Sequence, residues 1–212
     1  MSGVIYWGLW ILFRVLACLL LRFRTEGAQV FPETGGVIVA ANHASYLDIP
    51  LLACAIRRRV CFIGRANLFP NRYINWVFQR LGWIPFKTHR LDRKAFGVAL
   101  THLKSGIPVV IFPEGRRTED GQLQPGRPGI GYLVKESQCE VIPAYISGTF
   151  KVLPVKAKWP KLFPVSISFG KSVGFSKDEQ LNKKQEYEQI GKTVMDHIAR
   201  VGGRSVPHHD CH

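Results

Sequence analysis

Residues 37–48 read VIVAANHASYLD, a run of small and branched apolar residues followed at once by a polar segment. A short, continuous run of this kind is typical of a strand that is buried on both faces of a sheet. Further strand-like and helix-like segments alternate along the chain (strands at 60–63, 83–86, 107–112, 141–146 and 165–169; helices at 49–56, 71–81 and 92–104). This alternation predicts an α/β fold, with one domain and a mostly parallel sheet covered by helices.

The last predicted helix lies near the C-terminal end of the chain. Ser176 and Glu179 have the spacing of a capping box, which predicts that the helix begins there. Apolar residues then recur at helical spacing and indicate a face that packs on the core (Tyr187, Ile190, Val194, Ile198 and Val201). Because the sequence shows no repeat and no linker, we expect a helix within residues 1–25, the α/β domain at 26–202 and a flexible tail at 203–212.

The N-terminal segment at residues 4–21 is almost wholly apolar, with Arg14 as its one charge. The segment has about the length of a membrane span. Its tryptophans and the arginines that follow it favour the lipid headgroup region, where a helix could lie flat or dip into one leaflet with Arg14 directed outward. We expect a membrane-associated helix; the alternative is a helix buried in the core.

The chain is strongly basic, because 29 Lys and Arg residues against 15 Asp and Glu give a formal net charge of +14. Such a surface attracts anionic partners, which include nucleic acid, anionic lipid and phosphorylated substrates. The cysteines are scattered and form no C-x-x-C pair, which argues against a disulfide framework and a zinc site (Cys18, Cys54, Cys61, Cys139 and Cys211). We therefore expect a reducing compartment, at the cytoplasmic face of a membrane.

The polar segment at residues 42–48 begins where the first predicted strand ends. The carboxyl ends of strands are where open parallel sheets bind ligands. His43 is followed five residues later by Asp48, a spacing that one tight turn can close. Asp48 would then accept the Nδ1 proton of His43 and leave Nε2 as a general base. The alternative is a loop histidine beside an aspartate that caps the next helix.

A second polar segment, Phe-Pro-Glu-Gly-Arg-Arg-Thr at residues 112–118, follows the strand predicted at 107–112. It should therefore lie at the same sheet edge as His43. Gly115 would let the backbone approach a ligand closely, and the planar guanidinium of Arg117 suits a phosphate. The alternative is an ordinary surface turn with solvated arginines. Taken together, the two segments pair a base with an anion site.

These segments resemble the signature of the 1-acylglycerol-3-phosphate acyltransferase family, N-H-x-x-x-x-D followed by F-P-E-G-x-R. Asn42, His43 and Asp48 match the first motif, and residues 112–115 with Arg117 match the second.

Two looser matches complete the resemblance, which spans residues 26–171. One is the glycine-led segment at residues 82–90, which ends in Arg90, and the other is Val-Ile-Pro-Ala at 141–144. Lys87 and Arg93 are alternatives to Arg90, because the segment is longer than is usual in the family. Arg116 also departs from the family, which usually has a small polar residue at that position.

The resemblance implies a glycerolipid acyltransferase-like fold and an enzyme of phospholipid biosynthesis. The enzyme would move a fatty acyl group from an acyl-carrier protein or coenzyme A thioester to the free hydroxyl of 1-acylglycerol-3-phosphate, giving phosphatidic acid. His43 would be the base and Asp48 would orient it. Arg90 and Arg117 would hold the acceptor phosphate, and Glu114 and Gly115 would belong to the same binding site.

The resemblance implies no metal and no cofactor beyond the acyl donor. The expected partners are a phospholipid membrane, lysophosphatidic acid or a related lysolipid, and the acyl thioester carrier, with no nucleic acid. One alternative is the same transfer to another lysolipid or to dihydroxyacetone phosphate. A non-enzyme alternative is a basic module that binds membranes or nucleic acid, which would leave His43 and Asp48 without a task.

Overall fold

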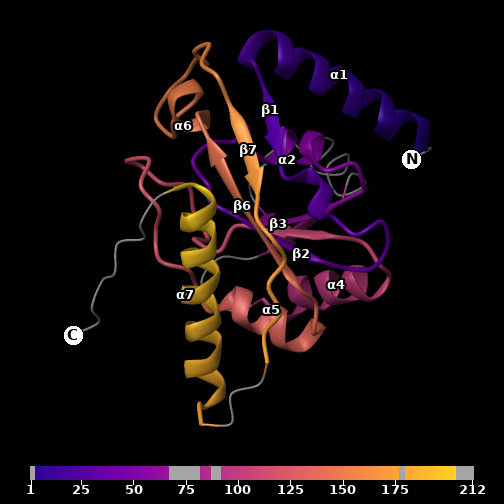
Figure 1. The fold of residues 1–212 in the computed structure, drawn as a ribbon, viewed down its shortest axis with the longest axis vertical. Coiled ribbons are helices and arrows are strands. Elements are labelled where there is room, and N and C mark those ends of the chain that lie inside the picture. The colour runs from indigo at the N-terminus through magenta and orange to yellow at the C-terminus, as the bar shows by residue number, and fades with distance from the viewer. Residues whose placement is uncertain (1–2, 67–81, 87–91, 177–179, 204–212) are drawn as a thin grey trace.

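The computed structural model describes residues 3–66, 82–86, 92–176 and 180–203. At its centre is a seven-stranded sheet with the strand order β1-β7-β6-β2-β5-β3-β4 (Figure 1). All neighbouring strands are parallel except β6 and β7, which confirms the predicted mostly parallel sheet. The strands are β1 (Arg24–Glu26), β2 (Ile38–Ala41), β3 (Cys61–Arg65), β4 (Trp83–Phe86), β5 (Val109–Ile111), β6 (Val141–Ser147) and β7 (Ser166–Phe169).

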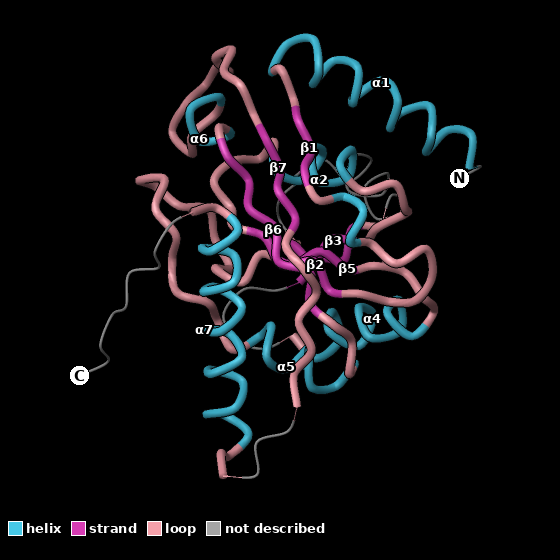
Figure 2. The backbone as a smooth tube through the Cα atoms, in the orientation of Figure 1, coloured by secondary structure: helices cyan, strands magenta, loops and turns pink. Residues whose placement is uncertain are grey.

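Helices cover both faces of this sheet (Figures 1 and 2). They are α1 (Gly3–Leu21), α2 (Asp48–Ala55), α4 (Arg93–Lys104), α5 (Gly129–Ser137), α6 (Thr149–Val152) and α7 (Lys183–Val201), with a 3-10 turn η1 (Ala28–Val30). Apart from the start of the last helix, the predicted strands and helices appear within a few residues of their expected bounds where the structure describes them. The helix predicted at residues 71–81 lies outside the described residues.

Strand β2 shows how the two layers are built from one sequence pattern. Its four residues are fully buried, so both faces of the strand lie in the core. Ile38 and Ala40 pack in the apolar cluster that holds α4, α5 and α7, whereas Val39 and Ala41 pack with α2 on the other face. Successive side chains of a strand point to opposite faces, so a run without polar residues serves two cores at once.

The start of the last helix differs from the prediction. Helix α7 begins at Lys183 with a capping box formed by Asn182 and Gln185, so the start predicted at Ser176 is wrong, and Glu179 lies outside the described residues. The Asn182 side chain accepts hydrogen bonds from the backbone N–H groups of Lys184 and Gln185, which makes it a strong N-cap. The predicted apolar face is confirmed, because Ile190, Val194 and Ile198 are buried.

Helix α1 packs on the C-terminal end of α2 along one narrow face. The Trp10 indole Nε1 donates to the carbonyl oxygens of Ala53 (2.9 Å) and Ile56, and Arg14 donates to the carbonyl of Cys54 at 2.7 Å. Arg14 therefore turns inward rather than outward, because the last carbonyls of α2 offer it acceptors and the negative end of a helix dipole. In the described part of the chain, no helix is long and apolar enough to cross a membrane.

Candidate active site

The two polar segments lie side by side at the carboxyl edge of the sheet, as predicted. Strands β2 and β5 are paired in parallel, with Ala40 opposite Ile111. The segments that leave them are also bonded to each other, because the backbone N–H of Thr118 donates to the carbonyl of His43 at 2.8 Å. Residues far apart in the sequence therefore meet in one site because their strands are neighbours.

His43 and Asp48 form the predicted pair. The Nδ1 atom of His43 lies 2.8 Å from Asp48 Oδ2, and the same oxygen accepts the backbone N–H groups of Ala44 and Ser45 at 2.7 and 2.8 Å. Asp48 is fully buried, while the His43 side chain keeps 13% of its surface exposed. The turn thus fixes the carboxylate by its backbone, and the carboxylate holds the imidazole with Nε2 as the nitrogen available for proton transfer.

Two further contacts fix the position of His43. Its ring stacks on that of Phe112, with centroids 4.0 Å apart and planes inclined by 15°. The preceding residue, Asn42, bridges to the end of β6: its Nδ2 donates to the Ile146 carbonyl at 3.0 Å, and its Oδ1 accepts the Ile146 N–H at 2.7 Å. Asn42 is buried and satisfied on both sides, so its contacts are those of a residue that positions His43.

The carboxyl group of Glu114 is turned into the protein. Only 2% of the residue is exposed, and its two oxygens accept the backbone N–H groups of His43 at 2.9 Å and Gln124 at 3.2 Å. Burial raises the pKa of Glu114 to about 8, and the two backbone hydrogen bonds act in the opposite direction. Glu114 therefore ties the second segment to the backbone of the base, a contact that the sequence did not predict.

The turn that carries Glu114 depends on Gly115 and on Arg127. Gly115 has φ +68°, and a Cβ there would meet the Arg127 side chain at 2.7 Å. The Nε of Arg127 donates to the Glu114 carbonyl at 3.1 Å, and the Arg127 backbone N–H donates to the Pro113 carbonyl at 2.8 Å. Gly115 thus gives the turn its shape, and Arg127 is a basic residue at the site that no sequence motif singled out.

Arg117 is half-buried and lies over the exposed ring of Tyr46, with its guanidinium carbon 3.6 Å from the ring centroid. This contact joins the two segments again and holds a planar cation beside the His43 turn. The neighbouring Arg116 is exposed. Arg90 and Lys87 lie outside the described residues, and Arg93 is an exposed residue in the first turn of α4.

The nearby hydroxyl and thiol groups are not placed as nucleophiles. Ser45 is fully buried, and its Oγ accepts the backbone N–H of Leu47 at 3.2 Å. Burial raises the pKa of the Cys54 thiol to about 11, so this thiol remains protonated. Proton abstraction by His43 is therefore the chemistry that this arrangement supports.

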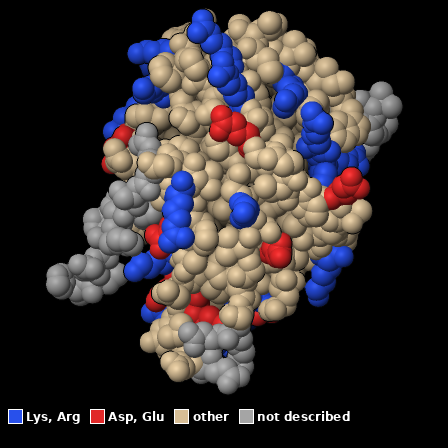
Figure 3. Space-filling view, viewed as in Figure 1, with Lys and Arg blue, Asp and Glu red and all other residues tan. Residues whose placement is uncertain are grey.

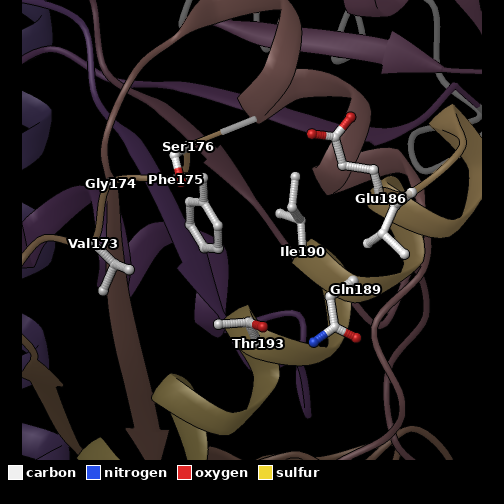
Figure 4. A pocket seen from close by; sticks show the side chains of 9 residues that line it. Val173, Gly174, Phe175, Ser176, Glu186, Gln189, Ile190 and Thr193 are labelled. Carbon is white, nitrogen blue, oxygen red and sulfur yellow. The ribbon is translucent and has the colours of Figure 1, made fainter. Parts of the chain in front are cut away.

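A pocket of about 280 Å³ lies at the opposite edge of the sheet (Figure 4). Phe175 lines it from the segment after β7. Residues of α7 line the other side (Glu186, Gln189, Ile190 and Thr193). Val173, which also lines it, pairs with Val141 at the start of β6, whereas Asn42 contacts the end of that strand. The pocket is thus separate from the His43 site.

Comparison with known proteins gives one family and one fold. A family model described as acyltransferase matches residues 22–147. Among curated relatives, chloroplastic 1-acyl-sn-glycerol-3-phosphate acyltransferases of Arabidopsis thaliana and Brassica napus are 29% and 31% identical over 138 and 134 residues, which cover 63% and 61% of this chain and 38% of each relative. The mouse alpha enzyme is 28% identical over 60% of this chain and 46% of its own. The chain thus matches less than half the length of these relatives.

A solved structure shares the fold over most of the chain. The crystal structure of the 1-acyl-sn-glycerophosphate acyltransferase PlsC from Thermotoga maritima has a TM-score of 0.72 to this structure, with 24% sequence identity. The match covers 91% of this chain and 79% of that one.

Proposed function

This chain belongs to the acyltransferase family, and we propose that it transfers a fatty acyl group from an acyl thioester to the free hydroxyl of 1-acylglycerol-3-phosphate, giving phosphatidic acid. The observation that carries this proposal is the hydrogen bond of 2.8 Å between His43 Nδ1 and Asp48 Oδ2 at the carboxyl edge of the sheet. Both acyl-carrier protein and coenzyme A thioesters are candidate donors.

The proposed reaction uses His43 as a general base. Nε2 takes the proton of the acceptor hydroxyl as its oxygen attacks the thioester carbonyl. The carbon–sulfur bond then breaks, and the imidazolium returns the proton to the leaving thiolate, so the products are an ester and a free thiol. Asp48 stabilises the imidazolium while it exists. The transfer is direct and passes through no acyl-enzyme, which agrees with the buried Ser45 and the protonated Cys54.

We propose that Arg117 holds the phosphate of the acceptor. Its guanidinium lies over Tyr46, and its N–H donors are not engaged by any described residue, so they can face an anion. Arg90 remains a proposed second phosphate ligand from the sequence motif. Glu114 holds the His43 backbone in the described geometry, and a contact to the glycerol part would have to coexist with that task.

The proposed setting is the cytoplasmic face of a membrane. The outward face of α1 exposes large apolar side chains while its inner face packs on α2 (exposed: Trp7, Ile11, Leu12, Phe13, Val15, Leu16, Leu19 and Leu20). An apolar surface of this size with basic residues around it suits the boundary between headgroups and acyl chains. The acceptor and the product would reside in the same lipid layer.

The experiment is a transfer assay with the purified protein in lipid vesicles, in which a labelled acyl group is followed into phosphatidic acid. Both donors are tested against lysophosphatidic acid, lysophosphatidylcholine and dihydroxyacetone phosphate. We expect transfer to lysophosphatidic acid to be the fastest, and His43→Ala is the negative control. Faster transfer to either other acceptor would replace the proposed substrate. Failure of every pair, with salt-dependent binding of duplex DNA, would support the non-enzyme alternative.

A further inference from the structure

The loop between α6 and β7 exposes large apolar side chains away from α1. Trp159 is 82% exposed and Leu162 is 75% exposed, and Phe163 beside them is also exposed. These values exceed those of every described large apolar residue on α1. Because single exposed apolar residues are ordinary but grouped ones indicate a contact surface, this loop needs a partner that covers it.

Lysines surround these apolar residues. Lys156, Lys158 and Lys161 are exposed in the same loop, and the amino group of Lys151 on α6 lies over the Phe163 ring at 4.5 Å from its centroid. In Figure 3 blue side chains are prominent over the upper part of the molecule, where Figure 1 places α6. A tryptophan and a leucine among flexible lysines match an anionic lipid surface, where ammonium groups meet phosphates and apolar rings enter the layer beneath.

The base of the loop is fixed to the domain. Val152 and Val165 at its two ends are buried in the core, and the Lys161 N–H donates to the Val152 carbonyl at 2.8 Å. The Val165 N–H also donates to the Leu21 carbonyl at the end of α1, at 3.0 Å. The loop therefore ends beside the C-terminal turn of α1, which also carries the strongly exposed Leu19.

The same loop adjoins the candidate active site. It follows α6, which comes directly after β6, and Ile146 of β6 is held by the Asn42 side chain next to His43. On the other side, Lys156 makes an exposed ion pair of 3.4 Å with Glu119, two residues after Arg117. A surface that rests on residues 154–164 thus lies next to both segments of the site.

We propose that residues 154–164 form a second lipid-contacting element, in which Trp159 and Leu162 enter an anionic lipid layer and Lys156, Lys158 and Lys161 contact its headgroups. The inference deepens the proposed function by assigning a surface to the membrane partner, and it rests on that function only in the choice of a lipid substrate. Contact at this loop and at α1 together would fix how the His43 site faces the lipid layer.

The test compares full-length variants by flotation with vesicles of phosphatidylcholine, with and without phosphatidylglycerol. We expect the double variant Trp159→Ser, Leu162→Ser to lower partitioning into the anionic vesicles by about tenfold or more, because two large side chains lose an apolar environment. Val98→Ser, at another exposed apolar residue on α4, is the matched control and should change little. Lys158→Gln should weaken binding only when phosphatidylglycerol is present, whereas the exposed Lys184→Gln on α7 should not.

A measurement on the unaltered loop guards against misfolding of the variant. Vesicles that contain brominated lipid should quench part of the tryptophan fluorescence of the native protein, and Trp159→Phe should remove that part. Unchanged partitioning of the double variant, or quenching in Trp159→Phe as strong as in the native protein, would overturn the proposal. So would normal vesicle binding with lost affinity for purified acyl-carrier protein, which would make the loop a protein-docking surface. Loop-dependent vesicle binding without acyl transfer would uphold this inference and defeat the proposed function.

Discussion

The candidate site buries carboxyl groups, whereas helix α1 exposes large apolar side chains. Both are the reverse of the usual placement of these groups. At the site, Asp48 is fully buried and Glu114 is 2% exposed, whereas on α1 Leu19 is 74% exposed. A buried carboxyl is unfavourable unless hydrogen bonds compensate it, and grouped apolar side chains are unfavourable in water. At the site the compensation is inside the molecule, in backbone N–H groups. On α1 the exposed apolar side chains have no such compensation among the described residues, and the proposed lipid layer would supply it.

This difference indicates which property a substitution in each region should change. The carboxyl groups at the site are held by neighbours in the same fold, so their geometry is complete without a ligand. The outward face of α1 leaves most of its large apolar side chains exposed, although its inner face packs on α2. Changes at the site should therefore alter chemistry, and changes on the outward face of α1 should alter location.

The largest effect is expected from removing the base. His43→Ala should lower the transfer rate by about 10²–10⁴-fold, because the acceptor hydroxyl loses its proton acceptor. Circular dichroism should show a folded domain, since Asp48 keeps the N–H groups of Ala44 and Ser45. His102→Ala near the end of α4 is the matched control and should keep its activity. Near-normal turnover of His43→Ala would remove His43 from the mechanism.

Asp48→Asn should lower the rate by about 10- to 100-fold, less than the loss of His43. Asp48 Oδ2 takes its three hydrogen bonds, and Oδ1 has no partner among the described residues. An asparagine can therefore keep the bonds with its oxygen and lose only the charge that stabilises the imidazolium. Full activity of this variant at unchanged stability would show that the charge of Asp48 has no part in catalysis.

Arg117→Ala should weaken binding of the acceptor, because a charge-assisted contact to its phosphate is lost. We expect the KM for the acceptor to rise by about 10- to 100-fold. The KM for the acyl donor should change little. Saturation curves for both substrates measure this, with the exposed Arg116→Ala as the matched control. An equal rise in both KM values would place Arg117 outside the phosphate site.

Sequence predicted the local parts of this site well. The His43–Asp48 pair spans one turn, and the strands before both segments are apolar runs, so residue spacing alone was sufficient. Contacts across the fold could not be predicted in this way. Glu114 meets the backbone of His43 across 71 positions, and Arg14 meets Cys54 across 40, so each depends on how elements pack rather than on a pattern.

The elements that sequence missed have weak patterns. Strand β1 is Arg-Thr-Glu, which has no apolar residue, because it forms the edge of the sheet. Helix α5 contains glycine, which is a poor helix former. Its Gly131 is needed for packing, because a Cβ there would meet the backbone of Tyr187 on α7 at 2.4 Å. Tertiary contacts override local propensity at both places.

Substitutions on the outward face of α1 should have a smaller effect, which is measured as vesicle binding and not as transfer rate. The double variant Leu16→Ser, Leu19→Ser should reduce binding to anionic vesicles by about tenfold while stability and activity toward a water-soluble acceptor stay near normal. On the inward face, Trp10→Phe should do the reverse: it loses two hydrogen bonds to α2, lowers Tm by a few degrees and leaves vesicle binding unchanged. Loss of stability in the serine variant would mean that α1 is a core helix on all sides.

The smallest effect concerns the pH dependence of stability at Glu114. Burial raises the pKa of this carboxyl from 4.5 to about 8 in the folded protein, so the folded chain binds its proton more tightly than the unfolded chain does. Its contribution to stability is therefore fully present below about pH 4.5 and falls as the pH rises toward 8. We expect Tm to fall as the pH rises through this range because of Glu114.

Glu114→Gln isolates this contribution, because an amide of similar shape cannot titrate. The variant has one hydrogen-bond acceptor fewer for the N–H groups of His43 and Gln124. This loss shifts Tm by the same amount at every pH. The quantity to measure is therefore the slope of Tm against pH. We expect that slope to flatten in Glu114→Gln and to persist in the exposed control Glu140→Gln. An unchanged slope would mean that the two backbone hydrogen bonds hold Glu114 ionised at neutral pH. Hydrogen bonds inside the site would then compensate fully for the burial of an ionised carboxylate. The contrast with the exposed apolar side chains of α1 would be larger than the exposed fractions alone indicate.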